Sequence, residues 1–476
     1  MHHIHTTALA AVLGIATAAS GQTSSLMRFD TTPHIEGSGV HSRPASSPTN
    51  DTPGETDLEA RSYSIVRSPG AHFIRVHFGT FDLDTASEIH ITSVADGATQ
   101  RFTHAMLEAW DGWSAIFNGD AVVVQLMVAS GESVSFSTDE IAVNIQDNDA
   151  GAGEGGVATL CGADNRTASN DSRVGRLSGA NCGSGGGCGG CTAWLTSVGC
   201  ALTAGHCGMA SGGLIEFNVP ASNSAGQPVA SAPEDQYPVG NFYYAFQNGG
   251  VGFDWAMMDV GPNANTGLRA HWVQGYFHLD PELSGDGTTL RITGCGVDNS
   301  PSGSQPGACC AWDDNGNCTH AGCNSTSLTV QTSTGPQTDS GSNFVRYAVD
   351  TEPANSGSPV IRTSTDFAVG IHTNGGCTSG GGENSGTRIA QATLSEYLGV
   401  FLGADSVFVD YADISVFEFG TAVYPAQTFT AGYSLAGSGD SVWFAGGSYT
   451  SANGNTGTFT KAITLRAASG VVTIGN

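Results

Sequence analysis

The cysteines place the strongest constraint on how this chain can fold. All 12 lie between residues 161 and 377, in one group at 161–207 and another at 295–377. Disulfides form and persist outside the reducing cytosol, so this number of cysteines suits an exported chain in which they are paired. We therefore expect a cross-linked unit in the middle of the chain, with modules lacking cysteine on either side.

Composition favours β-structure over helix. The 476 residues include 67 glycines, and only 12% are charged. Glycine supports the turns between short strands, whereas long soluble helices usually carry many charged residues. The chain is also too long for one hydrophobic core, and its length predicts about three domains. We expect an all-β protein of several domains.

The charge balance excludes two classes of partner. The chain has 16 Lys and Arg against 43 Asp and Glu, a net charge of −27, and Lys461 is its only lysine. Because no basic cluster exists, we expect no binding to nucleic acid or to an anionic membrane surface. A strongly negative surface favours a soluble monomer.

The N-terminal residues have the pattern of a secretory signal peptide. Residues 8–19 form a short apolar run, and the small residues at 19–21 fit a cleavage site. We expect a signal peptide at 1–21 and a secreted, extracellular protein without membrane insertion. The alternative is an N-terminal membrane anchor, for which the apolar run is short. Residues 22–58, rich in Ser, Thr, Pro and Gly, are expected to be a linker.

Alternating sequences predict β-modules on both sides of the cysteine-rich part. Residues 72–78 alternate apolar and polar side chains, as a half-buried strand does. Residues 59–147 are expected to form a β-sandwich that serves as a prodomain, a folding chaperone or a binding module. The Gly-rich stretch 148–157 is the expected linker and a candidate processing site. The C-terminal tail, 403–476, predicts short strands stacked like rungs of a parallel β-helix.

The residues suited to chemistry fall in three short segments, in chain order 202–207 (LTAGHC), 253–258 (FDWAMM) and 355–360 (NSGSPV). Taken singly, each has a structural explanation: a His beside a cysteine, a capping Asp and a Gly-Ser loop. Taken together, they supply a base, a carboxylate and a hydroxyl, namely His206, Asp254 and Ser356. Acyl transfer needs such a set, because the hydroxyl is a weak nucleophile until a base, itself oriented by a buried carboxylate, takes its proton.

Residues 158–402 resemble the trypsin-like (chymotrypsin-fold) serine peptidases. The three segments look like that family's signature segments, and Cys191–Leu195 looks like the strand whose cysteine closes the loop under the catalytic His. The resemblance implies a chymotrypsin-like double β-barrel and a serine endopeptidase that acts on proteins or peptides without a cofactor. It also implies that the three residues named above form the catalytic triad and that Cys191 pairs with Cys207.

The same resemblance places the oxyanion hole at the backbone N–H groups of Ala354 and Ser356. The family usually has Gly at the first of these positions. If the backbone there takes a positive φ, Ala354 adds strain of about 1 kcal/mol. The neighbouring Asn355 replaces an Asp that, in many members, pairs with the freed N-terminus during zymogen activation. We expect that ion-pair switch to be absent, so that the prosegment of a zymogen would block the site in another way.

Within the family, the resemblance is closest to the bacterial glutamyl-endopeptidase-like branch, through NSGSPV and the Gly370–His372 segment. It implies that Thr351 and His372 bind an acidic side chain and that cleavage follows Glu or Asp. A hydroxyl and an imidazole can both donate to a carboxylate, and such charge-assisted bonds are strong. The alternative for His372 is a packed structural imidazole. Asp350 is expected to face outward and to form no trypsin-like pocket.

A cysteine-rich insertion at 295–325 carries close-set cysteines at positions 309, 310, 318 and 323. Their spacing is not that of paired zinc knuckles, and an exported chain favours a disulfide-stapled surface loop over a zinc site. The Asp313–Asn317 run lacks the glycine and terminal glutamate of an EF-hand loop, so it favours a plain turn over a calcium site. We expect no metal.

Two other functions compete with that of an active endopeptidase. One is an adhesive or binding protein whose protease-like domain is catalytically weak or inactive, which the flanking modules and Ala354 would allow. The other is a non-proteolytic esterase, which the missing Gly-x-Ser-x-Gly elbow disfavours. The intact set of His, Asp and Ser favours the endopeptidase over both.

Overall fold

The computed structural model describes most of the chain after residue 57. The expected signal peptide and the Gly-rich linker 148–157 lie outside the described residues, as does most of the expected linker 22–58. The described ranges are 25–28, 41–42, 58–143, 160–178, 191–197, 199–207, 212–223, 226–245, 250–281, 285–298, 309–312, 318–321, 323–378, 380–402, 406–410, 426–436, 441–451, 460–467 and 471–475. None of the helices in these ranges is long and apolar enough to cross a membrane.

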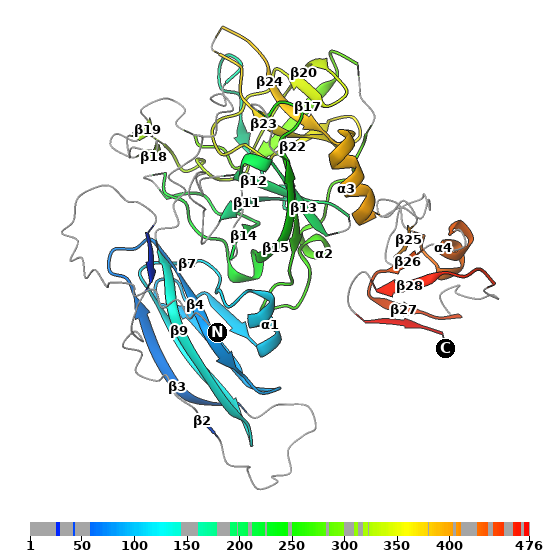
Figure 1. Ribbon diagram of the computed structural model, residues 1–476. Coiled ribbons are helices and arrows are strands. Elements are labelled where there is room, and N and C mark those ends of the chain that lie inside the picture. Colours follow the sequence, from blue (N-terminus) through cyan, green and yellow to red (C-terminus); the bar gives the residue numbers. More distant parts are fainter. Residues whose placement is uncertain are drawn as a thin grey trace, which may run out of the picture.

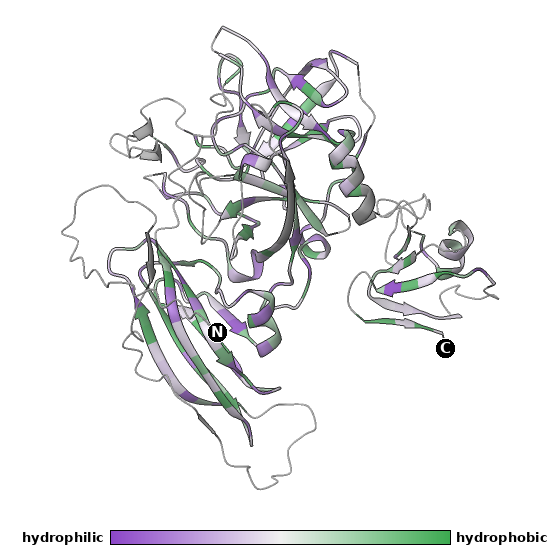
Figure 2. Cartoon of the chain, viewed as in Figure 1, coloured by the Kyte–Doolittle hydropathy of each residue, from purple (hydrophilic) through white to green (hydrophobic). Residues whose placement is uncertain are grey.

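The N-terminal module is a sandwich of two antiparallel sheets (Figure 1). One sheet has the strand order β3 (Leu58–Arg67), β8 (Ala121–Ala129), β5 (Glu88–Ser93), β6 (Thr99–Phe102). The other has the order β1 (Ser25–Arg28), β9 (Ser133–Val143), β4 (Phe73–Asp82), β7 (Phe117–Asn118), with β2 (His41–Ser42) also paired to β9. Helix α1 (His104–Ala109) adds Leu107 to the core. Buried and less buried residues alternate along β5 and through much of β9, as in strands that turn one face to the core of a sandwich. Figure 2 shows that apolar and polar residues are both present along the strands of this module.

The middle of the chain begins with a closed antiparallel barrel. Its strand order is β11 (Val174–Ser178), β12 (Cys191–Leu195), β13 (Cys200–Thr203), β16 (Trp255–Val260), β15 (Gln236–Ala245), β14 (Leu214–Glu216). The short helical turns η1 (Gly205–Cys207) and η2 (Pro233–Asp235) lie in its connections, and helix α2 (Ala270–Gln274) follows its last strand. Every residue of β12 and β13 is buried, as expected of strands covered on both faces.

A second barrel follows and closes through the pairing of β20 with β21. Its strand order is β20 (Gln331–Ser340), β17 (Thr289–Gly294), β22 (Pro359–Arg362), β23 (Phe367–Asn374), β24 (Asn384–Arg388), β21 (Phe344–Tyr347), with β10 (Thr167–Ala168) added at β20. Helix α3 (Ala392–Leu402) ends this part of the chain. Trp194 of the first barrel and Ile371 of the second share one core cluster. The chymotrypsin-like double barrel predicted from the sequence is therefore confirmed.

The C-terminal tail contains two small parallel sheets and a helix, α4 (Phe429–Leu435). One sheet has the order β25 (Ser406–Val409), β26 (Ser441–Phe444), β28 (Thr464–Ala467), and the other pairs β27 (Gly447–Tyr449) with β29 (Val472–Ile474). Parallel pairing of strands from successive passes of the chain is the pattern of stacked rungs, in keeping with the β-rich module predicted for this region.

The N-terminal module contacts the first barrel through buried polar groups. The guanidinium of Arg75, which is fully buried, donates to the carbonyl oxygens of Ser114 at 2.7 Å and Gly212 at 2.6 Å. The backbone of Ile116 exchanges two hydrogen bonds with the side-chain amide of Gln236, at 2.8 and 2.9 Å. Burial lowers the pKa of Arg75 to about 9, an effect that the nearby charge of Glu216 partly opposes. The two parts are therefore packed together rather than tethered.

Apolar packing continues across the same contact. Leu214 and Ala230 of the barrel region belong to the core cluster of the sandwich. As a consequence, the first four residues of β4, Phe73–Val76, are all buried. The expectation of a half-buried strand at 72–78 is wrong here, because the polar side of that strand carries Arg75 and faces the barrel.

The cysteines depart from the expectation of full pairing. Cys200 and Cys295 are buried free thiols. Burial raises the pKa of each thiol to about 12, so both stay protonated and pack as small apolar side chains. The insertion contains a short hairpin of β18 (Cys309–Trp312) and β19 (Cys318–Ala321), and the adjacent Cys323 is disulfide-bonded. This fits the disulfide-stapled loop expected there.

Candidate active site

His206 and Asp254 meet at one end of the first barrel. His206 lies in η1, directly after β13, and Asp254 directly precedes the neighbouring strand β16. The His206 ring places Nδ1 2.5 Å from Asp254 Oδ2, and the His206 backbone N–H donates to Asp254 Oδ1 at 2.9 Å. The Asp254 carboxylate is fully buried, whereas 17% of the His206 side chain is exposed. A buried carboxylate on Nδ1–H leaves Nε2 as the proton acceptor.

The second barrel holds Asp254 in place. The Thr387 hydroxyl, from β24, accepts a hydrogen bond from the Asp254 N–H at 3.1 Å and donates to its carbonyl oxygen at 2.8 Å. Gly250, with φ of +83°, packs on the carboxylate, where a Cβ would lie 2.9 Å from Asp254 Oδ2. The orientation of the carboxylate is thus fixed from both barrels.

The loop that carries Ser356 is attached to the first barrel beside His206. The Thr192 N–H, in β12, donates to the Ser356 carbonyl oxygen at 2.8 Å. The structure contains the Cys191–Cys207 disulfide, which ties β12 to the turn that holds His206. The Ser356 side chain is partly exposed, whereas Ser358 is fully buried. Of the two serines, only Ser356 is accessible to a substrate.

Ala354 has a positive φ of +77°, the backbone conformation for which the sequence analysis allowed. Its carbonyl oxygen accepts from the Thr192 hydroxyl at 3.0 Å, and that hydroxyl in turn accepts from the Cys295 N–H at 2.8 Å. Among the described residues, no acceptor lies within hydrogen-bonding distance of the N–H groups of Ala354 or Ser356. Two backbone donors in one loop are thus left for an oxyanion.

Replacing Ala354 with glycine is expected to leave the stability nearly unchanged. Relief of the positive φ, about 1–2 kcal/mol, offsets the loss of a buried methyl group, about 0.8 kcal/mol, and the added chain entropy of glycine, about 0.4–1 kcal/mol. Ala193→Gly, in the buried strand β12, has no strain to relieve and is the control, with an expected loss of about 1–2 kcal/mol. The measurement is the free energy of unfolding of each variant, obtained by urea unfolding. Equal losses of that free energy in Ala354→Gly and Ala193→Gly would show that Ala354 is unstrained.

Comparisons with known proteins found similar solved structures that cover about half of this chain. No family model and no curated protein matches the chain. Among solved structures, it is similar to a Glu endopeptidase in complex with MPD, at 20% identity and a TM-score of 0.33, over 51% of this chain and 98% of that chain. It is also similar to the protease Anisep from Arthrobacter nicotinovorans, at 15% identity and a TM-score of 0.35, over 49% of this chain and 97% of that chain. A third structure, human heparin binding protein, has 13% identity and a TM-score of 0.34, over 51% of this chain and 97% of that chain. Likenesses this weak carry no argument about activity, which rests on the site itself.

The two residues expected to bind the substrate side chain are both buried near the Ser356 loop. His372 lies on β23. Its backbone N–H donates to the Ser358 carbonyl oxygen, and its backbone carbonyl oxygen accepts from the Gly357 N–H, both at 2.8 Å. Its Nδ1 lies 2.7 Å from the Tyr347 hydroxyl, while its Nε2 has no partner among the described residues. Burial, reinforced by the charge of the nearby His206, lowers the pKa of His372 to about 3. The imidazole is therefore neutral at neutral pH.

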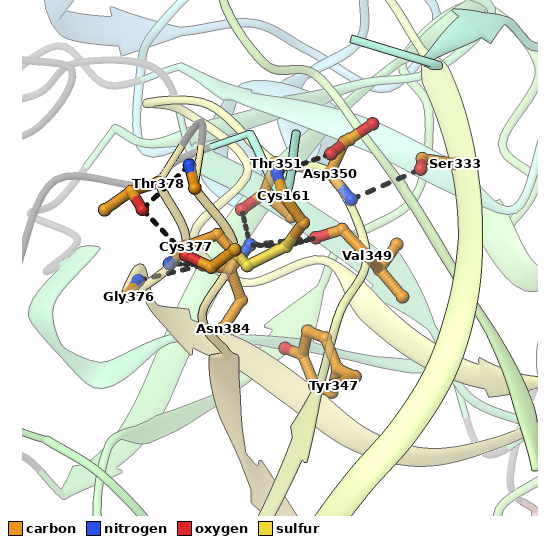
Figure 3. The surroundings of a disulfide bond; sticks show 12 residues. Cys161, Ser333, Tyr347, Val349, Asp350, Thr351, Gly376, Cys377, Thr378 and Asn384 are labelled. Atoms are coloured by element: carbon orange, nitrogen blue, oxygen red, sulfur yellow. Dashed lines mark hydrogen bonds between the residues drawn. A yellow bond between two sulfur atoms is a disulfide. The ribbon is translucent and has the colours of Figure 1, made fainter. Parts of the chain in front are cut away.

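Thr351 is held by an amide that sequence analysis did not single out. Asn384, fully buried on β24, donates to the Thr351 hydroxyl at 2.9 Å and to the Val349 carbonyl oxygen at 2.8 Å (Figure 3). Its carbonyl oxygen accepts the N–H groups of Gly376 at 2.9 Å and Cys377 at 3.1 Å. One side chain thus connects the segment of Thr351 to the segment that follows β23.

Asp350 is buried, so the expectation that it faces outward is wrong. Its carboxylate accepts the N–H groups of Cys161 at 2.6 Å and Asn165 at 2.9 Å, and only 2% of the residue is exposed (Figure 3). The reason is that the start of the cysteine-rich unit covers it, held there by the Cys161–Cys377 disulfide. The position of these two cysteines, the outermost of the chain, was the only sequence signal for this contact.

One group of potential metal ligands occurs among the described residues, consisting of Cys191, His206 and Cys207. The two cysteines are joined in the disulfide and have no thiolate to offer. This group is therefore explained by the arrangement around His206 and not by a metal.

Proposed function

We propose that this protein is a secreted serine endopeptidase with His206, Asp254 and Ser356 as its catalytic triad. The observation that carries the proposal is the His206 Nδ1 to Asp254 Oδ2 contact of 2.5 Å, made by a fully buried carboxylate at the point where the Ser356 loop joins the first barrel. A buried carboxylate on Nδ1 holds the imidazole in the tautomer that leaves Nε2 free to accept a proton, and it stabilises the imidazolium that general-base catalysis forms.

The chemistry follows from these positions. The Ser356 Oγ attacks the scissile carbonyl carbon while His206 Nε2 takes its proton, and the resulting oxyanion accepts from the N–H groups of Ala354 and Ser356. His206 then gives the proton to the leaving amine as the C–N bond breaks, which leaves an acyl-enzyme. Water, deprotonated by the same Nε2, attacks the ester carbonyl, and His206 then returns that proton to the Ser356 Oγ as the ester bond breaks and the acid product is released. No cofactor takes part in these steps.

We also propose that the preferred substrate has Glu or Asp directly before the scissile bond. What supports it is a pair of buried groups, the Thr351 hydroxyl and His372 Nε2, on segments adjacent to or bonded to the Ser356 loop. His372 Nε2 has no partner among the described residues, and both groups can donate to a carboxylate. The burial of Asp350 under two backbone N–H groups argues against a pocket for Arg or Lys. A neutral His372 also avoids leaving an unpaired buried charge when no substrate is bound.

Labelling with a fluorophosphonate tests the triad directly. The wild-type protein should form one adduct, and Ser356→Ala should form none. Ser358→Ala is the matched control, because Ser358 lies two residues away but is fully buried, and it should be labelled like the wild type. Absence of labelling in the wild type, or labelling that survives Ser356→Ala, would favour the adhesive or binding protein.

A panel of peptides that differ only in the residue before the cut tests the preference for Glu or Asp. Faster turnover of the Phe or Arg peptide than of the Glu peptide would contradict that preference.

A further inference from the structure

His372 and Thr351, the two residues proposed to bind the substrate side chain, are each hydrogen-bonded to another buried polar residue. The Tyr347 hydroxyl lies 2.7 Å from His372 Nδ1, and the Asn384 amide nitrogen lies 2.9 Å from the Thr351 hydroxyl. All four residues are at most 1% exposed. Buried hydrogen bonds of this kind are not exchanged with water, so the direction in which each proton points is a property of the fold.

The bond between Tyr347 and His372 has a preferred direction. Among the described residues, the Tyr347 hydroxyl has no acceptor other than His372 Nδ1. Either tautomer leaves one hydrogen of the pair without an acceptor among the described residues, the phenolic hydrogen or the one on Nε2. A phenolic O–H is, however, a stronger donor than an imidazole N–H, and an imidazole nitrogen is a stronger acceptor than a phenolic oxygen, so donation by Tyr347 gives the stronger bond. Burial also raises the pKa of Tyr347 well above its ordinary value, so the hydroxyl keeps its hydrogen to donate. Donation by Tyr347 leaves the His372 proton on Nε2.

Asn384 likewise fixes the direction of its hydrogen bond with the Thr351 hydroxyl. The carbonyl oxygen of the Asn384 amide accepts two backbone N–H groups, from Gly376 and Cys377, so the amide cannot be flipped without losing both bonds. Its nitrogen must therefore face the Thr351 oxygen and donate to it. Because a lone pair of Thr351 is occupied in this way, its own hydrogen remains to be donated to a third group.

We propose that Tyr347 and Asn384 are positioning residues that make His372 and Thr351 both hydrogen-bond donors, so that the pocket selects a carboxylate over the isosteric carboxamide, Glu over Gln. This inference rests on the proposed function, because it assigns the substrate side chain to the same two groups. A carboxylate offers only acceptors and satisfies both donors. A carboxamide can offer one oxygen, and its NH₂ group would face a donor, a mismatch of the kind that buried sites reject strongly.

The test is the ratio of kcat/KM for two peptides that differ only in Glu or Gln before the cut. In the wild type we expect a ratio on the order of 10² or more. Tyr347→Phe retains the ring but frees His372 to take either tautomer, and it should lower the ratio about tenfold through KM for the Glu peptide. Turnover of a peptide with Ala before the cut should stay within about twofold. Tyr449→Phe is the control: Tyr449 is also fully buried and donates to carbonyl oxygens, but in the C-terminal module, and its loss should leave the ratio unchanged.

A second measurement does not depend on turnover. In the full-length wild-type protein labelled with ¹⁵N in its histidines, NMR at pH 7 should show His372 with its proton on Nε2 and an unprotonated Nδ1. A proton on Nδ1, or a Glu/Gln ratio that Tyr347→Phe leaves unchanged, would overturn the inference while the Glu preference of the wild type stands. A wild type that cuts the Glu and Gln peptides equally would overturn both the inference and the proposed preference. An undamaged triad would still be visible in that case from fluorophosphonate labelling.

Discussion

Asp254→Asn is expected to lower kcat about 10⁴-fold on any peptide that the protein cuts, with little change in fold. The local contacts dictate how the new side chain would sit. The Asp254 Oδ1 position accepts the His206 backbone N–H, so the asparagine oxygen would take that place and its NH₂ group would face Nδ1. Nδ1 would then become the acceptor and the proton would move to Nε2. A protonated, neutral Nε2 cannot act as the base for Ser356.

The measurement is steady-state kinetics with a peptide substrate, together with circular dichroism to verify the fold. Asp259→Asn is the control on the same strand, because 49% of that side chain is exposed and its partner is Arg269 at the surface. It should change kcat less than about twofold, as surface ion pairs contribute little. If Asp254→Asn retained a tenth or more of the wild-type kcat, the assignment of Asp254 to the triad would be wrong.

A cut in the chain between residues 144 and 159 is expected to leave the N-terminal module bound to the barrels. Separation would expose Leu214 and Ala230, which lie in the core of the sandwich, and would break the bonds between Ile116 and Gln236. It would also leave the Gly212 carbonyl without its donor, Arg75. These costs fall on both sides of the contact, so the module should behave as a permanent part of the folded protein and not as a removable prodomain.

The experiment introduces a site for a specific protease into that segment and follows the cleaved protein by gel filtration at micromolar concentration. Both fragments should elute together in the wild type. Arg75→Ala should release the N-terminal fragment or lower the melting temperature, because it leaves the buried carbonyl oxygens of Ser114 and Gly212 without their donor, at a cost of about 1–3 kcal/mol each. Arg101→Ala alters an exposed side chain of the same module and should behave as the wild type. Elution of the wild-type fragments apart from each other would support the prodomain.

The sequence predicted those parts of the site that local patterns encode. His206, Asp254 and Ser356 each lie in a short segment with a recognisable pattern, and the structure brings the strands and loops of these segments to one end of the first barrel. Ala354 was predicted to be strained if φ were positive, and φ is +77°. Such features depend on a few adjacent residues, so a single sequence contains them.

Contacts between distant residues could not be predicted in this way. Tyr347 and Asn384 act on partners 25 and 33 residues away, and neither lies in a motif of its own. The period of two in β4 indicates a polar face but not that this face, with Arg75, is covered by another module. Counting cysteines predicted pairing, but it could not distinguish the two buried thiols, Cys200 and Cys295, from the rest.

The Cys161–Cys377 disulfide joins the first segment of the cysteine-rich unit to the segment beside Asn384, and Asp350 holds the same first segment by two N–H groups. The Asp350 carboxylate is already satisfied by these two bonds, and Asn355 carries no charge, so neither residue offers an ion pair to a newly cut N-terminus. The covalent link between these two segments instead needs oxidation, which the cytosol does not provide. For a chain that is exported, as proposed above, the segment beside Asn384 would be fixed covalently only after the chain has left the cytosol.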